Sequence, residues 1–156
     1  MKSKSFFLLK LFFLSIYIIF LINEELISKE IKYAFGLITT PSGDQINVEI
    51  ADTILKRRLG LSNRPNLKKN WGMLFIFDKS EMHSFWMKNM SFSLDIIWLE
   101  NYRIVQIHEN VMPVPSGKKP TILRPLVPVN FVLEIAAGRA NELNLRKGDL
   151  LDYIFY

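Results

Sequence analysis

Apolar and polar positions alternate on both sides of a short turn in residues 36–50. The stretches "GLITT" and "QINVEI" flank "PSGD", and Ile46, Val48 and Ile50 are separated by polar residues. Because successive side chains of a strand point to opposite faces, this alternation is typical of a strand with one buried face. Pro, Ser, Gly and Asp are common turn residues. The pattern therefore predicts a β-hairpin.

The following stretch, "ADTILKRRLG", has the spacing of a short helix. Asp52 is placed to cap the start of this helix and Gly60 to end it. One helical face carries three apolar residues, Ile54, Leu55 and Leu59. Residues 56–58 then point towards solvent, and we expect the helix to cover one edge of a sheet.

The sequence pattern predicts mainly strands in the rest of the chain. Strands are predicted at 71–77 ("WGMLFIF"), 84–88, 94–99, 103–110 ("RIVQIHEN"), 131–135 ("FVLEI") and near the C-terminus in "KGDLLDYIFY". A second short helix is expected in "RANELNL". The predicted class is mainly β (α+β), a small β-sandwich or partly open barrel of about 6–8 strands with two short helices.

The strands at 94–99 and 103–110 form a predicted hairpin whose register decides which side chains meet. A two-residue turn at positions 100–101 places Asp95 opposite Gln106 and Ser93 opposite His108 on one face. Glutamate at the first turn position is unfavourable, because the preferred turns need positive φ there. A register shifted by one residue therefore stays an alternative.

A proline-rich connection follows this hairpin. Val111 to Asn130 contains five prolines, with Gly117 and basic residues between them. Connections of this length are usually functional or disordered, and the apolar residues of this one indicate that it packs on the body. We interpret it as a flap.

The N-terminal segment is typical of an export signal. A lysine-bearing start, "MKSKSFFLLK", precedes an apolar run from Leu11 to Ile22, which the acidic "NEELISKE" follows. We expect residues 1–30 to be a signal peptide or membrane anchor, with a possible membrane tether through residues 6–22, and 31–156 to form a single domain. The flanking charges predict an exported protein, in the bacterial periplasm or on the outer face of the cytoplasmic membrane.

Composition narrows the function classes. The formal charge is +5, and +4 remains once the four lysines and three glutamates of residues 1–30 are set aside. The basic residues are scattered, so the sequence predicts no nucleic-acid partner. No cysteine is present, which excludes disulfides and thiolate metal sites. His83 and His108, with Glu81 and Glu109, lack metal-ligand spacing, so we expect neither a metal nor a cofactor.

Four motifs in order resemble a known family of exported proteins, domain of unknown function 192. They are "GMLFIF" (72–77), "FWMKNM" with "LDIIWL" (85–90 and 94–99), "VLEI" with "AG" (132–135 and 137–138) and "KGD" (147–149). The resemblance runs from about Ile46 to the C-terminus. It implies a small, mainly β domain with short helices, and it supplies no catalytic residues. The sequence departs from the family pattern at Ser62, Ser93 and Tyr102.

The polar residues of "SFWMKNMSFSLDIIWLE" are the main candidate site. Period-two alternation places Trp86 and Lys88 on one strand face, with Asn89 and Asp95 nearby. A ring, a cation and an amide could hold a small ligand with a carboxylate or a sugar. In the alternative interpretation, Lys88 pairs with Asp95 and Asn89 forms a hydrogen bond with turn backbone, so that these groups only stabilise the core.

The sequence therefore leaves three function classes open. The favoured one is a non-enzymatic module that binds a small ligand or an envelope partner through Trp86, Lys88, Asn89 and Asp95. The second is a hydrolase of cell-envelope material, with Ser93, His108 and Asp95 as catalytic candidates. The third is a structural envelope protein.

Overall fold

The computed structural model describes residues 10, 12–18, 31–115 and 117–156, and its contacts divide the chain into Met1–Lys32 and Tyr33–Tyr156. In the first unit, residues 12–18 are helical. No helix within the described residues is long and apolar enough to cross a membrane. Most of the predicted leader lies outside the described residues, so the signal-peptide and anchor alternatives stay predictions.

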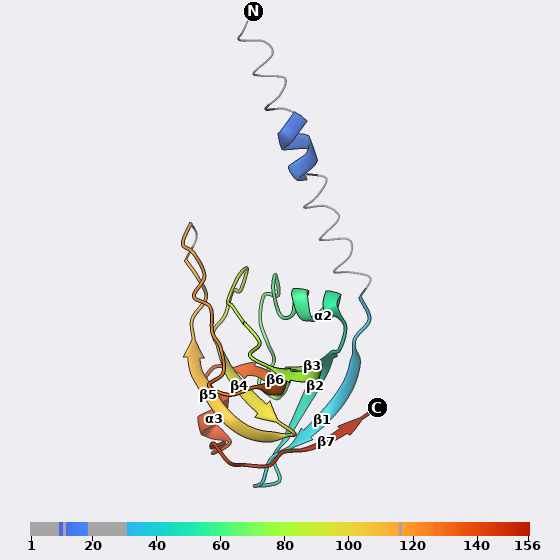
Figure 1. Ribbon diagram of the computed structural model, residues 1–156, viewed down its shortest axis with the longest axis vertical. Coiled ribbons are helices and arrows are strands. Elements are labelled where there is room, and N and C mark those ends of the chain that lie inside the picture. Colours follow the sequence, from blue (N-terminus) through green and yellow to red (C-terminus); the bar gives the residue numbers. More distant parts are fainter. Residues whose placement is uncertain (1–9, 11, 19–30, 116) are drawn as a thin grey trace, which may run out of the picture. The chain divides into compact units, whose positions relative to one another are not determined.

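The second unit is built on one seven-stranded mixed sheet (Figure 1). The strands are β1 (Ala34–Thr39), β2 (Gln45–Ala51), β3 (Trp71–Glu81), β4 (Leu94–Glu100), β5 (Arg103–Val111), β6 (Val129–Ala136) and β7 (Asp152–Phe155). The helices are α2 (Ile54–Leu59) and α3 (Arg139–Glu142). The strand order is β5-β4-β6-β3-β2-β1-β7, with β2 and β3 parallel and the other neighbours antiparallel.

The sheet curves until its two ends approach each other. The edge strand β5 meets the turn that precedes β7, where Ile104 N donates to Asp149 O and Gly148 N donates to Ile104 O, both at 2.8 Å. β5 and β7 are not neighbours in the strand order, so the sheet is not closed. The prediction of a mainly β fold, a partly open barrel with short helices, is confirmed.

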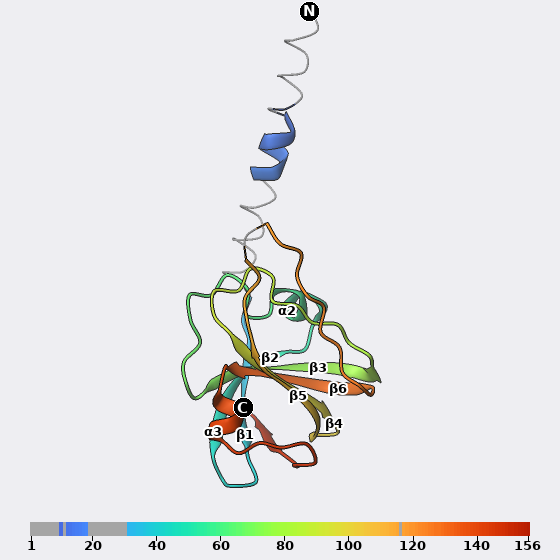
Figure 2. The same cartoon turned by 90° about the vertical axis from the view of Figure 1, so that its left-hand side faces the viewer.

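Each face of the sheet carries its own core. On one face, side chains such as Leu74, Ile97 and Leu133 pack with α3 and the segment before β7. On the other face, Met73, Ile96 and Val132 lie under the loops that precede and follow β3. We call this second face the outer face; α2 and the long loops lie on its side of β3 and β6, and α3 lies on the opposite side (Figure 2).

The predicted register of the β4–β5 hairpin was wrong. The turn lies at Asn101 and Tyr102, which both have positive φ (48° and 65°), and Glu100 pairs with Arg103. A type I′ turn needs positive φ at both central residues, and asparagine tolerates positive φ better than glutamate. With an irregularity further along the ladder, His108 lies opposite Ile96, so the expected Ser93–His108 pair does not form.

The strand predicted at 84–88 is reduced to a single bridge. Phe85 pairs with Leu123 of the proline-rich loop, through two hydrogen bonds of 3.0 and 2.8 Å. Pro125 lies two residues after Leu123 and has no N–H to donate, so the ladder does not extend in that direction. The proline-rich loop therefore braces the 83–86 segment.

Candidate functional site

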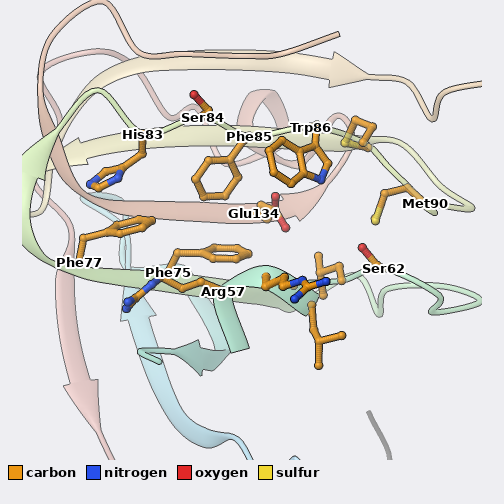
Figure 3. Close-up of a pocket in the computed structure, with 15 residues that line it drawn as sticks. Arg57, Ser62, Phe75, Phe77, His83, Ser84, Phe85, Trp86, Met90 and Glu134 are labelled. Atoms are coloured by element: carbon orange, nitrogen blue, oxygen red, sulfur yellow. The ribbon is translucent and has the colours of Figure 1, made fainter. Parts of the chain in front are cut away.

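A pocket of about 210 Å³ opens on the outer face (Figure 3). Its walls come from α2 and the turn after it, from β3, from β6 and from residues 83–90. Four aromatic rings contribute to the lining, Phe75, Phe77, Phe85 and Trp86. None of the described residues of the 111–130 loop lines this pocket, so the loop supports one wall instead of covering the mouth as a flap.

Glu134 is the acidic side chain of this pocket. It follows the apolar run of β6, and the sheet register places it between Met73 of β3 and Ile96 of β4, which are both fully buried. The side chain is only 6% exposed. Among the described residues no hydrogen bond or ion pair reaches its carboxyl group, although buried polar groups are normally paired. Figure 3 shows the carboxyl turned into the pocket, between the ring-bearing walls.

Burial raises the pKa of Glu134 to about 8. Water and charged partners normally stabilise a carboxylate, and here the apolar surroundings disfavour the ionised form. The positive charge of Arg64 acts in the opposite direction but is the weaker influence. Arg64 is itself held by Glu49, with two contacts of 2.6 Å. Glu134 is therefore mostly protonated near neutral pH.

The aromatic walls are packed against one another and fixed. The Phe75 and Phe85 rings meet edge to face with centroids 4.9 Å apart, and Phe77 stacks on His83 at 3.5 Å. Trp86 is 48% exposed. The pocket therefore has a rigid aromatic base and one large ring that a ligand can cover.

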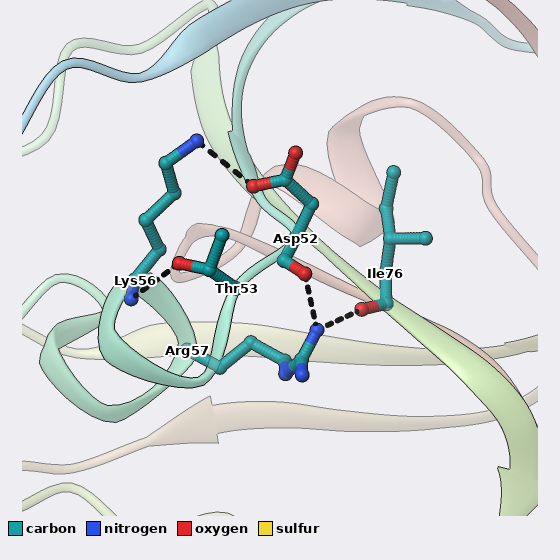
Figure 4. A network of polar contacts seen from close by, with 5 residues as sticks. All are labelled: Asp52, Thr53, Lys56, Arg57 and Ile76. Atoms are coloured by element: carbon teal, nitrogen blue, oxygen red, sulfur yellow. Dashed lines mark hydrogen bonds and ion pairs between the residues drawn. The ribbon is translucent and has the colours of Figure 1, made fainter.

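α2 forms the opposite wall, and it is oriented differently from the prediction. Thr53, not Asp52, caps the helix, by accepting a hydrogen bond from Lys56 N at 3.2 Å; Asp52 instead pairs with the Lys56 ammonium at 2.8 Å. Arg57 donates to the carbonyl oxygens of Asp52 and Ile76, both at 2.7 Å (Figure 4). These bonds tie α2 to β3 through a basic residue that was expected to face solvent.

Two of the three residues of the apolar face predicted for this helix are consequently exposed, while Leu59 is half-buried and lines the pocket. Ile54 is 81% and Leu55 44% exposed, and no residue of α2 is buried. Ile54 and Leu55 therefore do not cover a sheet edge as expected, and hydrogen bonds of Arg57 hold the helix to β3 instead.

The four residues of the predicted site are not gathered at one place. Trp86 lines the pocket, but Lys88, Asn89 and Asp95 do not. Lys88 and Asn89 are exposed, and their backbone carbonyls accept hydrogen bonds from the Ser62 hydroxyl (3.1 Å) and from Asn63 N (2.8 Å). A ligand role for this group stays a prediction.

Asp95 is fully buried and bonds to backbone. Its two carboxylate oxygens accept hydrogen bonds from Asn110 N (2.9 Å) and Ala140 N (2.8 Å). The second bond satisfies an N–H in the first turn of α3, whose N-cap residue, Gly138, has no side chain. Asp95 therefore joins β4 to the end of β5 and to α3.

The residues considered for a hydrolase have separate surroundings. His108 Nδ1 accepts a hydrogen bond from the Trp98 indole at 2.8 Å, and its Nε2 lies 2.9 Å from the Gln106 amide. Burial lowers the pKa of His108. With Ser93 out of register, no nucleophile faces this ring from the paired strand. In the described part of the chain no three His, Cys, Asp or Glu side chains gather as a metal site would need.

Sequence reasoning missed Glu134 because "VNFVLEIA" reads as an ordinary strand. One signal was available. A single glutamate in an otherwise apolar strand, with apolar neighbours on both sides, must be paired, neutral or functional when both sheet faces are covered.

Comparison with known proteins places the chain among uncharacterised relatives. UPF0127 proteins from Thermococcus gammatolerans and Thermococcus kodakarensis are each 27% identical, over 69% and 68% of this chain. The matches span 66% and 64% of the length of those relatives.

Two solved structures share the fold. One is a protein from Sinorhizobium meliloti described as a candidate transcription regulator, with 32% identity and a TM-score of 0.70 over 80% of this chain and 97% of that one. The other is a protein of unknown function from Novosphingobium aromaticivorans, with 32% identity and a TM-score of 0.67 over 76% and 83%. The family DUF192, described as uncharacterized ACR, matches residues 37–153, and the chain therefore belongs to this family.

Proposed function

We propose that this protein is a non-enzymatic module that binds a small ligand in the pocket around Glu134. The observation that carries the proposal is the unpartnered carboxyl group of Glu134, which is 6% exposed and faces a cavity lined with aromatic rings. An unpaired polar group costs stability, and a ligand that bonds to it would remove that cost. The predicted leader would place the pocket outside the cytoplasm, which makes an envelope metabolite the expected kind of ligand.

A hydrolase is a weaker candidate. Glu134 has a pKa suited to proton transfer, but it is the only carboxyl side chain among the described residues that line this pocket. Ser93, His108 and Asp95 also have surroundings of their own, as described above. The purely structural alternative does not account for an open pocket with an unpaired buried acid.

Methionine methyl signals can test whether the pocket binds ligands. Met90 lines this pocket, Met87 lies between it and a second cavity beside the proline-rich loop, and Met112, which is 74% exposed, lines that second cavity but not this pocket. We expect small planar probes such as benzamidine, benzamide, benzoate, indole and imidazole to include at least one that shifts the Met87 and Met90 methyl resonances of the full chain saturably, without shifting Met112. If no probe does so at millimolar concentration, the proposal fails.

Trp86→Ala should weaken binding without unfolding the protein. Because the ring is half exposed, its removal is expected to change the free energy of unfolding by less than about 1 kcal/mol. Loss of the contact between the Trp86 ring and a ligand is expected to lower the affinity by roughly tenfold or more. Calorimetric titration and thermal unfolding of the same preparation measure both quantities.

Lys88→Met serves as the matched surface variant. Lys88 lies outside the pocket lining, so its replacement is expected to leave affinity within about twofold. Loss of binding with unchanged thermal stability would instead support the surface that was predicted from the sequence, with Lys88 and Asn89 as ligand contacts.

A further inference from the structure

We infer that the ligand of this pocket is a small planar organic cation, one that carries an amidinium or guanidinium group for the carboxylate of Glu134. This inference rests on the proposed function and names the chemical class of its ligand. It follows from three features of the pocket, which are the missing partner of the acid, the aromatic walls and the placement of the nearby arginines.

The first feature is that Glu134 lacks the partner that a buried acid requires. A carboxylate in an apolar site is stable only with a positive charge or several hydrogen bonds beside it. No described residue forms an ion pair or hydrogen bond with Glu134, and the charge of Arg64, which does act on it, is already paired with Glu49. A planar amidinium presents two parallel N–H donors in the geometry that a carboxylate accepts, so such a ligand would provide both charge and hydrogen bonds at once.

The second feature is the aromatic lining beside this acid. The faces of aromatic rings carry negative potential and attract cations, most strongly for tryptophan. Phe75 and Phe85 form one packed pair, and the half-exposed Trp86 comes next in the chain. In Figure 3 the Glu134 carboxyl lies near these rings. An acid together with aromatic rings is a combination that favours an organic cation over an anion.

The third feature is that two of the neighbouring arginines, Arg57 and Arg64, are held by groups other than Glu134. The charged and titratable groups around Glu134 are Arg57 and Arg58 on α2, Arg64 with its partner Glu49, and His83. β3 and β4 place only the apolar Met73 and Ile96 beside it.

Arg57 and Arg64 are both held by other groups. Arg57 donates to two backbone carbonyls and lies over the Phe77 ring, with its guanidinium carbon 5.1 Å from the ring centroid. Arg64 is the arginine whose charge lowers the pKa of Glu134, and Glu49 compensates it. These two arginines therefore do not neutralise Glu134 by pairing with it, which leaves its carboxyl group available to a further cation.

Binding of a cation should release a proton. Without ligand, Glu134 is protonated below its pKa of about 8, and a cation binds the ionised form. Below that pH the affinity for a permanent cation is therefore expected to rise about tenfold for each unit of pH. A neutral ligand that bonds to the protonated acid would show no such rise.

Three probes of nearly equal shape separate the possibilities, namely benzamidine (cation), benzamide (neutral) and benzoate (anion). With the full chain at about pH 8, where half of Glu134 is ionised, benzamidine is expected to bind at least about tenfold more tightly than benzamide. At about pH 7, calorimetry in two buffers of different ionisation heat should show close to one proton released with benzamidine and none with benzamide.

Two variants assign the proton to its residue. Glu134→Gln should abolish both the proton release and the preference for benzamidine over benzamide, while it still folds. His83→Gln replaces the histidine that also lines the pocket, and proton release that persists in this variant belongs to Glu134.

The outcomes separate this inference from the proposed function. Benzamide or benzoate binding as tightly as benzamidine, or benzamidine binding without proton release, would overturn the inference and leave a ligand-binding pocket. If none of the three probes binds, the inference also fails. The methyl signals of Met87 and Met90 with indole and imidazole then decide whether the pocket binds anything.

Discussion

Glu134→Gln is expected to make the protein more stable at about pH 8 than the unaltered chain, by on the order of 3–5 kcal/mol. The reason is the burial that raises the pKa of this acid from 4.5 to about 8. Each unit of that shift corresponds to about 1.4 kcal/mol of difference between folded and unfolded states. Glutamine has nearly the same shape and cannot ionise, so the variant does not bear this cost.

The pH dependence has a definite sign. Between pH values of about 4.5 and 8 the folded chain holds the Glu134 proton more tightly than the unfolded chain, so stability falls as pH rises through this window. At and below a pH of about 4.5, the ionisation of Glu134 should make little difference between the free energies of unfolding of Glu134→Gln and the unaltered chain. Chemical denaturation at several pH values should therefore give a difference between Glu134→Gln and the unaltered chain that grows with pH and levels off above about 8.

Glu109→Gln is the matched control, because it makes the same change at an exposed position on β5. Its stability should follow that of the unaltered chain at every pH, within about 0.5 kcal/mol. A Glu134→Gln variant that is less stable than the unaltered chain at high pH would show that the acid has a partner within the folded protein. Glu134 would then not be the unpaired acid for which a ligand is proposed.

A gain of stability at the expense of binding is what a site residue is expected to show. Residues that must remain unpaired until a ligand arrives are costly to the folded state, and their replacement commonly stabilises a protein while removing function. A residue that only supports the fold shows the opposite behaviour. Glu134 and Asp95, the two fully or nearly buried acids among the residues that the structure describes, are expected to differ in this way.

Local sequence patterns predicted the parts of the fold that depend on short-range chemistry. Strict alternation at Ile46, Val48 and Ile50 gave the β1–β2 hairpin, and Gly60 correctly marked the end of α2. The proline-rich connection and the short helix after Gly138 were also predicted. In each case, side-chain alternation or the special φ of glycine and proline is enough to decide the local structure.

The errors occurred where distant contacts decide. The orientation of α2 depends on a hydrogen bond between Arg57 and the backbone of Ile76, nineteen residues later, which no helical pattern contains. The β4–β5 register depends on whether the turn begins at Glu100 or at Asn101, a difference of one residue that moves His108 away from Ser93. The pocket itself brings α2, β3, β6 and the 83–90 segment together, so its acid could not be recognised from one strand.

Asp95→Asn is expected to destabilise the protein by about 2–4 kcal/mol, in contrast to the change at Glu134. Both oxygens of the Asp95 carboxylate accept hydrogen bonds from backbone N–H groups, of Asn110 and Ala140. Asparagine has only one carbonyl oxygen, and its amide would point an N–H towards one of these donors. One backbone N–H would then be left unpaired in a fully buried position, and α3 would lose the side chain that caps it.

Asp149→Asn provides the comparison for this prediction. Asp149 also accepts a backbone hydrogen bond, from Arg146 N at 2.8 Å, but it lies in a partly exposed turn where water can replace the lost contact. Its replacement is expected to cost less than about 1 kcal/mol. Denaturant unfolding of both variants measures the difference in stability, and titration with benzamidine measures whether the folded fraction still binds.

A folded Asp95→Asn protein should still bind benzamidine, because the Asp95 carboxylate bonds to backbone away from the pocket lining. Unchanged stability with complete loss of binding would instead return Asp95 to the ligand site that the sequence predicted, and the pocket at Glu134 would no longer account for the binding.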